Sequence, residues 1–157
     1  MIAELQGYAA FFKSTHGLML RSIDGLSEAQ ALERPDGANP LLWIAAHMVS
    51  VRCSIAKALG ANVDVPWASQ FPRGGEVANV TTWPSLADVR ARWDEVHAAF
   101  MVRLESLTSA EVAAATPAPS LDRTVLGTVG LGALHDAYHV GQLAAGRRRH
   151  GMDRLVG

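Results

Sequence analysis

The first 23 residues carry apolar side chains at alternating spacings of three and four, the period that places them on one face of an α-helix. Gly25 follows the last of them and suits a C-terminal helix cap. We expect a first helix that ends near Ile23, then a polar, turn-rich stretch over residues 24–39 with one short helical turn at 27–33. The positions of this stripe are Ile2, Leu5, Ala9, Phe12, His16, Met19 and Ile23.

A second helix is indicated between residues 39 and 60. Asn39 is a residue type that caps helices, Pro40 is favoured at the first helical position, and Gly60 suits the end. The next stretch, 61–84, contains three prolines and has no sustained period. A loop of this length inside a compact domain is often functional. It can also carry the chain across a bundle, so that the helices on either side run parallel.

Two further helices are expected after this loop. Ser85 and Asp88 have the spacing of a capping box, which opens a third helix whose apolar stripe ends at Leu107. The loop 116–124 then leads to a fourth helix at about residues 128–150, which Gly151 stops. This pattern predicts an all-α four-helix bundle with a long connection between helices 2 and 3. At 157 residues, the chain fits a single domain over 1–157.

Charge and composition narrow the function classes. With 14 basic and 15 acidic residues, the chain offers no electrostatic footprint for nucleic acid or for an anionic membrane. Its one cysteine, Cys53, permits no intramolecular disulfide, and we expect it to be a core thiol. No apolar run has the length of a membrane span and the N-terminus shows no signal-peptide pattern, so we predict a cytoplasmic protein. Abundant alanine, and arginine in place of lysine, suggest a GC-rich bacterial source.

Histidines provide the candidate chemistry. His135 and His139 are four residues apart, so their rings project from one helix face and can reach the same cation, although two polar residues on a solvated face would look identical. His47 lies in an apolar helical segment, where an unpaired imidazole costs about 1–3 kcal/mol. Either a metal shared with a facing helix or a hydrogen bond in the core satisfies it. Zincin, di-iron and Ser-His-Asp patterns are incomplete in this sequence.

Two segments resemble the DinB/YfiT-like superfamily of bacterial metal-binding four-helix bundles. NPLLWIAAHM is similar to the family's second-helix entry, and TVGLGALHDAYHVGQLAAGRR is similar to its fourth-helix signature. The resemblance spans essentially the whole chain and implies that His47, His135 and His139 are the ligands of one divalent ion, zinc or nickel. It further implies a homodimer. Several related branches are transferases or isomerases that use a low-molecular-weight thiol such as bacillithiol or mycothiol, and the DNA-damage name reflects gene induction.

Three neutral histidines would leave the ion with open positions for water or for a thiol. Water leads to hydrolysis and a thiol leads to thiol transfer. The resemblance alone favours a thiol S-transferase acting on a small electrophilic substrate. A metal-dependent hydrolase and a non-enzymatic metal-binding or stress-response module remain the alternatives.

Other residues are weaker candidates. His16 is either a pocket residue or a hydrogen-bonded core histidine, and Asp136 and Gln142 either orient ligands and substrate or are exposed. We expect Tyr138 to be core and His97 to be half-exposed. Trp67 and Phe71 either line the mouth of an apolar pocket or anchor the long loop. The basic residues at 147–149 complement the dipole of the last helical turn.

Overall fold

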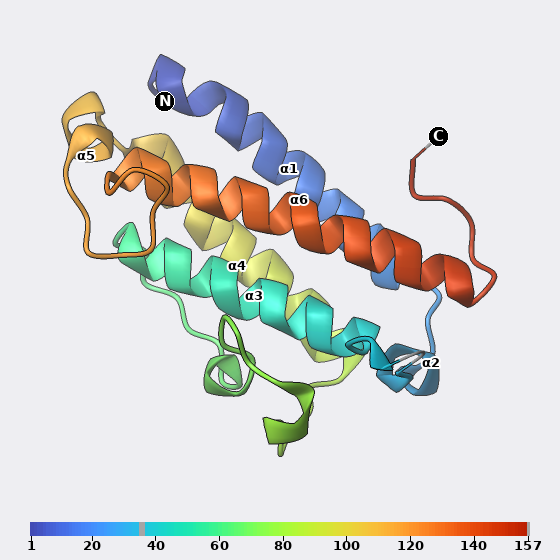
Figure 1. Cartoon of the computed structure of the whole chain (residues 1–157). Helices are drawn as coiled ribbons and strands as arrows, with labels where there is room; N and C mark the ends of the chain where they lie inside the picture. The colour runs from blue at the N-terminus through green and yellow to red at the C-terminus, as the bar shows by residue number, and fades with distance from the viewer. Residues whose placement is uncertain (35–36, 157) are drawn as a thin grey trace.

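The computed structural model describes residues 1–34 and 37–156, so Pro35 and Asp36 of the predicted turn-rich stretch and the last residue, Gly157, lie outside it. The described part has no strand beyond one isolated bridge, between Ala115 and Thr124, which confirms the all-α prediction. Four long helices form the bundle (Figure 1). The helices are α1 (Ala3–Ile23), α2 (Glu28–Leu32), α3 (Leu41–Ala58), η2 (Ala68–Gln70), η3 (Val77–Asn79), α4 (Leu86–Ser106), α5 (Ser109–Ala113) and α6 (Val125–Arg149).

The long connection between α3 and α4 crosses the bundle, so these two helices run in the same direction (Figure 1). Arg52 of α3 contacts His97 of α4, and Leu59 just after α3 contacts Arg103 near the end of α4. Helix α6 packs against α3 in the opposite direction. The fold therefore places residues from the first half of α3 opposite the middle of α6.

Most helix ends follow the predicted signals. Gly25 has a φ of +74°, and Ser85 and Asp88 form the predicted capping box. The start of α3 was predicted one residue too early: Pro40 has a ψ of 147°, so it occupies the cap position, and Asn39 makes no capping bond. The fourth helix starts earlier than predicted, at Val125, because the Thr124 side chain accepts from the Gly127 backbone N–H.

Helix α3 is the central helix of the core. Among the described residues it is the one helix long and apolar enough to cross a membrane, and 72% of its apolar window is buried inside the bundle. That burial is typical of the core helix of a soluble helical protein. Cys53, on this helix, is buried as predicted, and burial raises the pKa of its thiol.

Candidate metal centre

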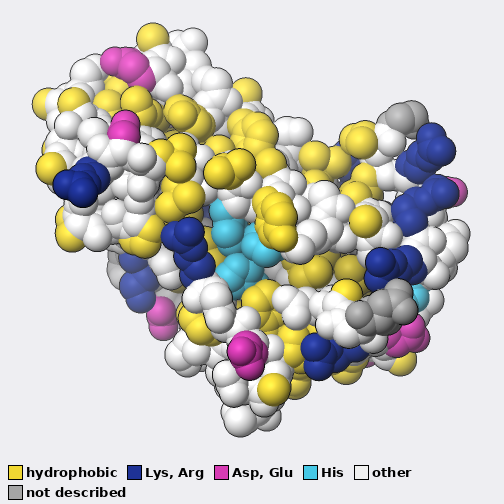
Figure 2. Space-filling view, in the orientation of Figure 1, with side chains coloured by type: hydrophobic (Ala, Val, Ile, Leu, Met, Phe, Trp, Pro, Cys, Tyr) yellow, Lys and Arg dark blue, Asp and Glu magenta, His cyan; other side chains and the backbone are white. Residues whose placement is uncertain are grey.

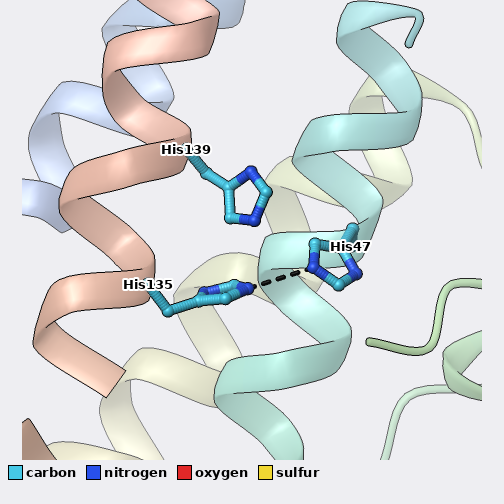
Figure 3. A group of neighbouring side chains, drawn as sticks. All are labelled: His47, His135 and His139. Atoms are coloured by element: carbon cyan, nitrogen blue, oxygen red, sulfur yellow. Dashed lines mark hydrogen bonds between the residues drawn. The ribbon is translucent and has the colours of Figure 1, made fainter. Parts of the chain in front are cut away.

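Three histidines from two helices converge inside the bundle (Figure 3). His47 lies on α3, and His135 and His139 lie one turn apart on α6. Their candidate ligand atoms are all within 4.8 Å of one another, and the Nε2 atoms of His47 and His135 are 3.0 Å apart. A single ion at 2.0–2.1 Å from two imidazoles, with a bond angle between square and tetrahedral, separates the nitrogens by about 3 Å. The group can hold one divalent ion.

A backbone carbonyl fixes the His47 ring. Its Nδ1–H donates to the carbonyl oxygen of Phe71 at 2.9 Å, which leaves the Nε2 lone pair facing the other two histidines. Phe71 is fully buried in the long loop, and the Trp43 ring stacks on the imidazole at 4.9 Å. Phe71 therefore acts as a loop anchor, one of the two predicted alternatives, and its carbonyl supports a metal ligand as well.

A side-chain amide fixes the His139 ring. Its Nδ1–H donates to Gln142 Oε1 at 2.8 Å, so Nε2 carries the free lone pair. Gln142 in turn donates from Nε2 to the Tyr138 hydroxyl oxygen at 3.1 Å. Gln142 thus orients a candidate ligand, the functional alternative left open for it. Tyr138 is 62% exposed, so the prediction that it belongs to the core was wrong.

His135 has a different surrounding. Its Nδ1 is buried and has no hydrogen-bond partner in the part of the chain that the structure describes. Asp136 Oδ1 lies 3.6 Å from this nitrogen. An imidazole that binds a metal through Nε2 carries its proton on Nδ1, and metal-bound histidines usually donate that proton to a carboxylate or carbonyl. The free Nδ1 beside a buried carboxylate suits a metal ligand.

Two of these imidazoles are held neutral. Burial, together with the smaller effects of the neighbouring His135 and His47, lowers the pKa of His139 to about 4. Burial also lowers the pKa of His47, against the opposing effect of its bond to Phe71. Metal ligation requires the neutral form of histidine, so His47 and His139 can bind an ion without first losing a proton at neutral pH.

A buried ion pair joins α3 and α6 next to the three histidines. Arg52 of α3 is 1% exposed, Asp136 of α6 is 2% exposed, and they form a salt bridge. Arg52 also donates to the Thr15 hydroxyl at 3.1 Å, and its guanidinium lies 3.9 Å from the centre of the Trp93 ring. The network fixes the residue next to His135 in the chain, and a buried carboxylate stays charged at low cost only with such a partner.

His16 does not join the three-histidine group. It is half-buried, its Nε2 donates to Asp94 Oδ1 at 3.0 Å, and its ring stacks on the His97 ring at 4.0 Å. This matches the core-histidine alternative. His97 is half-buried as predicted, and its Nδ1 accepts from Arg52 at 3.0 Å, while burial and the charges of His16 and Arg52 lower its pKa to about 3.

A cavity of about 590 Å³ opens beside the histidines, with His135 in its wall. Figure 2 shows the histidine rings at the bottom of a hollow with apolar side chains above them. Trp67 and Phe71, predicted as pocket-mouth candidates, are absent from this lining, and their neighbours Ala68 and Pro72 take that place. The volume is that of a small-molecule site.

Two groups that shape the site were not predicted from the sequence. The Phe71 carbonyl is a backbone group, which residue type does not reveal. The sequence does not reveal that Arg52 lies opposite Asp136 in the fold. An arginine in the middle of an otherwise apolar helix was the available signal.

Comparisons with known proteins add one finding. A family model described as the DinB superfamily matches residues 12–143, a range that includes all three histidines of the group. A comparison with curated proteins found no match.

Proposed function

The chain belongs to the DinB superfamily, and from this premise we propose that it is a metal-dependent enzyme, a thiol S-transferase that joins a low-molecular-weight thiol to a small electrophilic substrate. The observation that carries the proposal is the convergence of three imidazoles from α3 and α6 beside a cavity. Zinc or nickel suits ligation by imidazole alone. The protein is proposed to act in the cytoplasm as a homodimer.

The ion would supply positive charge at an open position, which lowers the pKa of a thiol that binds there. The residues of the chain orient the ligand atoms and surround the substrate. His47 and His139 present their Nε2 atoms because Phe71 and Gln142 accept the Nδ1 protons. The apolar cavity wall excludes water from the electrophile, so that sulfur rather than water forms the new bond to carbon. The thiol proton passes to solvent, and the leaving group departs with its bonding electrons.

The test compares thiol-dependent with thiol-independent turnover. Zinc-loaded and nickel-loaded protein would be assayed with 1-chloro-2,4-dinitrobenzene and with 4-nitrophenyl acetate, each with and without cysteine, bacillithiol or mycothiol. We expect turnover of the electrophile with at least one thiol, and loss of that turnover in His139→Ala. Equal ester cleavage with and without thiol would contradict the transferase and favour the hydrolase. No turnover of either substrate, with or without a thiol, would favour a non-enzymatic binding module.

A further inference from the structure

The cavity beside His135 has an apolar wall. Helices α3 and α6 form its two sides, and the long loop and the loop before α6 close its ends. The apolar side chains of the wall are Val51, Ile55, Ala58, Ala68, Pro72, Ala118, Pro119, Leu131 and Leu134. Such a wall gains free energy by covering an apolar ligand, at about 25 cal/mol for each Å² removed from water.

Hydroxyl groups in this wall offer little to an anion. Ser50 donates to the Ala46 carbonyl at 2.8 Å, and Ser54 donates to the Ser50 carbonyl at 3.0 Å. Thr128 likewise donates to the carbonyl of Thr124, the cap residue of α6, at 3.4 Å. Because each proton points back to the helix, these hydroxyls present mainly lone pairs to the cavity. A ligand that needs a donor must find it elsewhere in the wall.

Arg73 provides that donor. Of the described residues that line the cavity, it is the one with a permanent charge, and no carboxylate in the described ranges pairs with it. Arg73 lies in a tight turn in which the Gly75 N–H donates to the Pro72 carbonyl at 3.0 Å and Gly74 has a φ of +73°. A type II turn needs a positive φ at this third position, which glycine adopts freely.

The same loop is tied to the three histidines. Phe71, two residues before Arg73, is fully buried and accepts the Nδ1 proton of His47. The loop that carries Arg73 is therefore anchored on His47, a candidate metal ligand. Arg73 and His135 both lie in the wall of the same cavity. Basic side chains lie directly beside the histidine rings in Figure 2.

We infer that this cavity binds a small molecule with an apolar body and a carboxylate, and that Arg73 holds the carboxylate. The inference rests on the proposed function in taking this molecule to be the electrophilic substrate, whose reactive carbon lies toward His135. A planar guanidinium pairs with a carboxylate through two parallel hydrogen bonds, which makes the choice of anion specific. The Tyr138 hydroxyl, whose oxygen accepts from Gln142, keeps its own proton free as a second donor in the same wall.

Binding of octanoate and of octanamide, measured by isothermal titration calorimetry, tests the assignment. The two probes share an apolar chain and differ in charge. We expect the metal-free and the zinc-loaded wild-type protein to bind octanoate about fivefold more tightly than octanamide, the range of a partly exposed ion pair. Arg73→Ala should abolish this preference without weakening octanamide binding, and Arg73→Lys should retain part of it. Arg148→Ala, which removes an exposed arginine outside the cavity, is the matched control and should keep the full preference.

Three results would overturn the assignment. One is an unchanged preference in Arg73→Ala. Another is a preference present only in zinc-loaded protein, which would show that the ion holds the carboxylate. The third is failure of wild-type protein to bind either probe. Because the metal-free measurement needs neither turnover nor a thiol, a protein that keeps the Arg73-dependent preference but transfers no thiol would disprove the proposed reaction alone.

Discussion

At the level of single residues, the three imidazoles differ in the group that faces their Nδ1 atom, the ring nitrogen not available to the ion. A backbone carbonyl accepts from His47, a side-chain amide accepts from His139, and the Nδ1 of His135 faces Asp136 at 3.6 Å without a hydrogen bond. Support of this kind orients metal ligands and raises their basicity. Gln142 is the support that mutation can remove with least disturbance, because its side chain is only half-buried.

Gln142→Ala is expected to weaken zinc binding about 10- to 100-fold, the usual cost of losing an outer partner of a ligating histidine. The physical reason is that His139 loses the acceptor for its Nδ1 proton and the ring becomes free to rotate. Competition with a chromophoric chelator measures the affinity. Gln142→Glu, which keeps an acceptor, should lose less zinc affinity. Gln6→Ala, at an exposed position of α1, is the control and should bind zinc as the wild type does. Equal zinc affinity in Gln142→Ala and wild type would show that the bond to His139 does not orient a ligand.

The metal-free protein is expected to lose stability as the pH falls from 7 to 5. In the unfolded chain histidines take up protons near pH 6.5, whereas the pKa of His139 in the folded protein is lowered to about 4. The unfolded state therefore binds more protons in this window, and protonation favours it. For His139 alone the loss is about 2 kcal/mol at pH 5.

Urea unfolding of metal-free protein at pH 7, 6 and 5 measures this effect. His47, His16 and His97 also have a lowered pKa and act in the same direction, so the total loss should exceed that of His139. His139→Ala should show a shallower dependence than wild type. A free energy of unfolding that stays constant from pH 7 to pH 5 would mean that the histidines titrate normally in the folded protein.

The convergence of His47, His135 and His139 could be predicted from the sequence, because the spacing of His135 and His139 and the resemblance to a family point to the same three residues. The groups that accept the Nδ1 protons of His47 and His139 could not be predicted in the same way. Helical spacing places Tyr138 on one face with Leu131 and Leu134, which favours a core position, yet Leu134 is itself 60% exposed. Helical periodicity identifies the residues of one face, but it does not say whether that face packs against a neighbour or borders a cavity.

At the element scale, the register between α3 and α6 determines the site. This register brings His47 opposite His135 and Arg52 opposite Asp136, two contacts that join the same pair of helices. Capping boxes and glycine stops predicted most helix ends, since their signals are local. The short helix α5 and the 3₁₀ turns η2 and η3 were not predicted, because elements of three to five residues show no repeating period.

The Arg52–Asp136 pair is expected to hold α3 against α6. Arg52→Ala should lower the free energy of unfolding by about 3–5 kcal/mol, because it leaves a buried carboxylate without its partner. Urea denaturation of the metal-free protein measures the change. The double variant Arg52→Met with Asp136→Leu removes both charges and should recover much of the loss. Wild-type stability in Arg52→Ala would show that Asp136 does not depend on this partner.

At the scale of the whole molecule, the long crossing connection has two consequences. It lets α3 and α4 run parallel, and its middle section contacts His47 through the Phe71 carbonyl and contributes Ala68, Pro72 and Arg73 to the cavity wall. Its length in the sequence allowed a crossing of the bundle as one of two interpretations, whereas its contact with His47 appears only in the folded structure. We propose that this arrangement holds one divalent ion between two helices.

The amount of zinc bound per chain tests this proposal. Protein would be saturated with zinc, dialysed at pH 7.5 against metal-free buffer and analysed for zinc per chain. We predict one zinc per chain for the wild type and for His150→Ala, whose histidine lies at the end of α6 outside the group, and no retained zinc for His47→Ala or His139→Ala. Wild-type protein that retains no zinc or nickel, or variants that retain it as well as the wild type does, would show that the three histidines do not hold an ion.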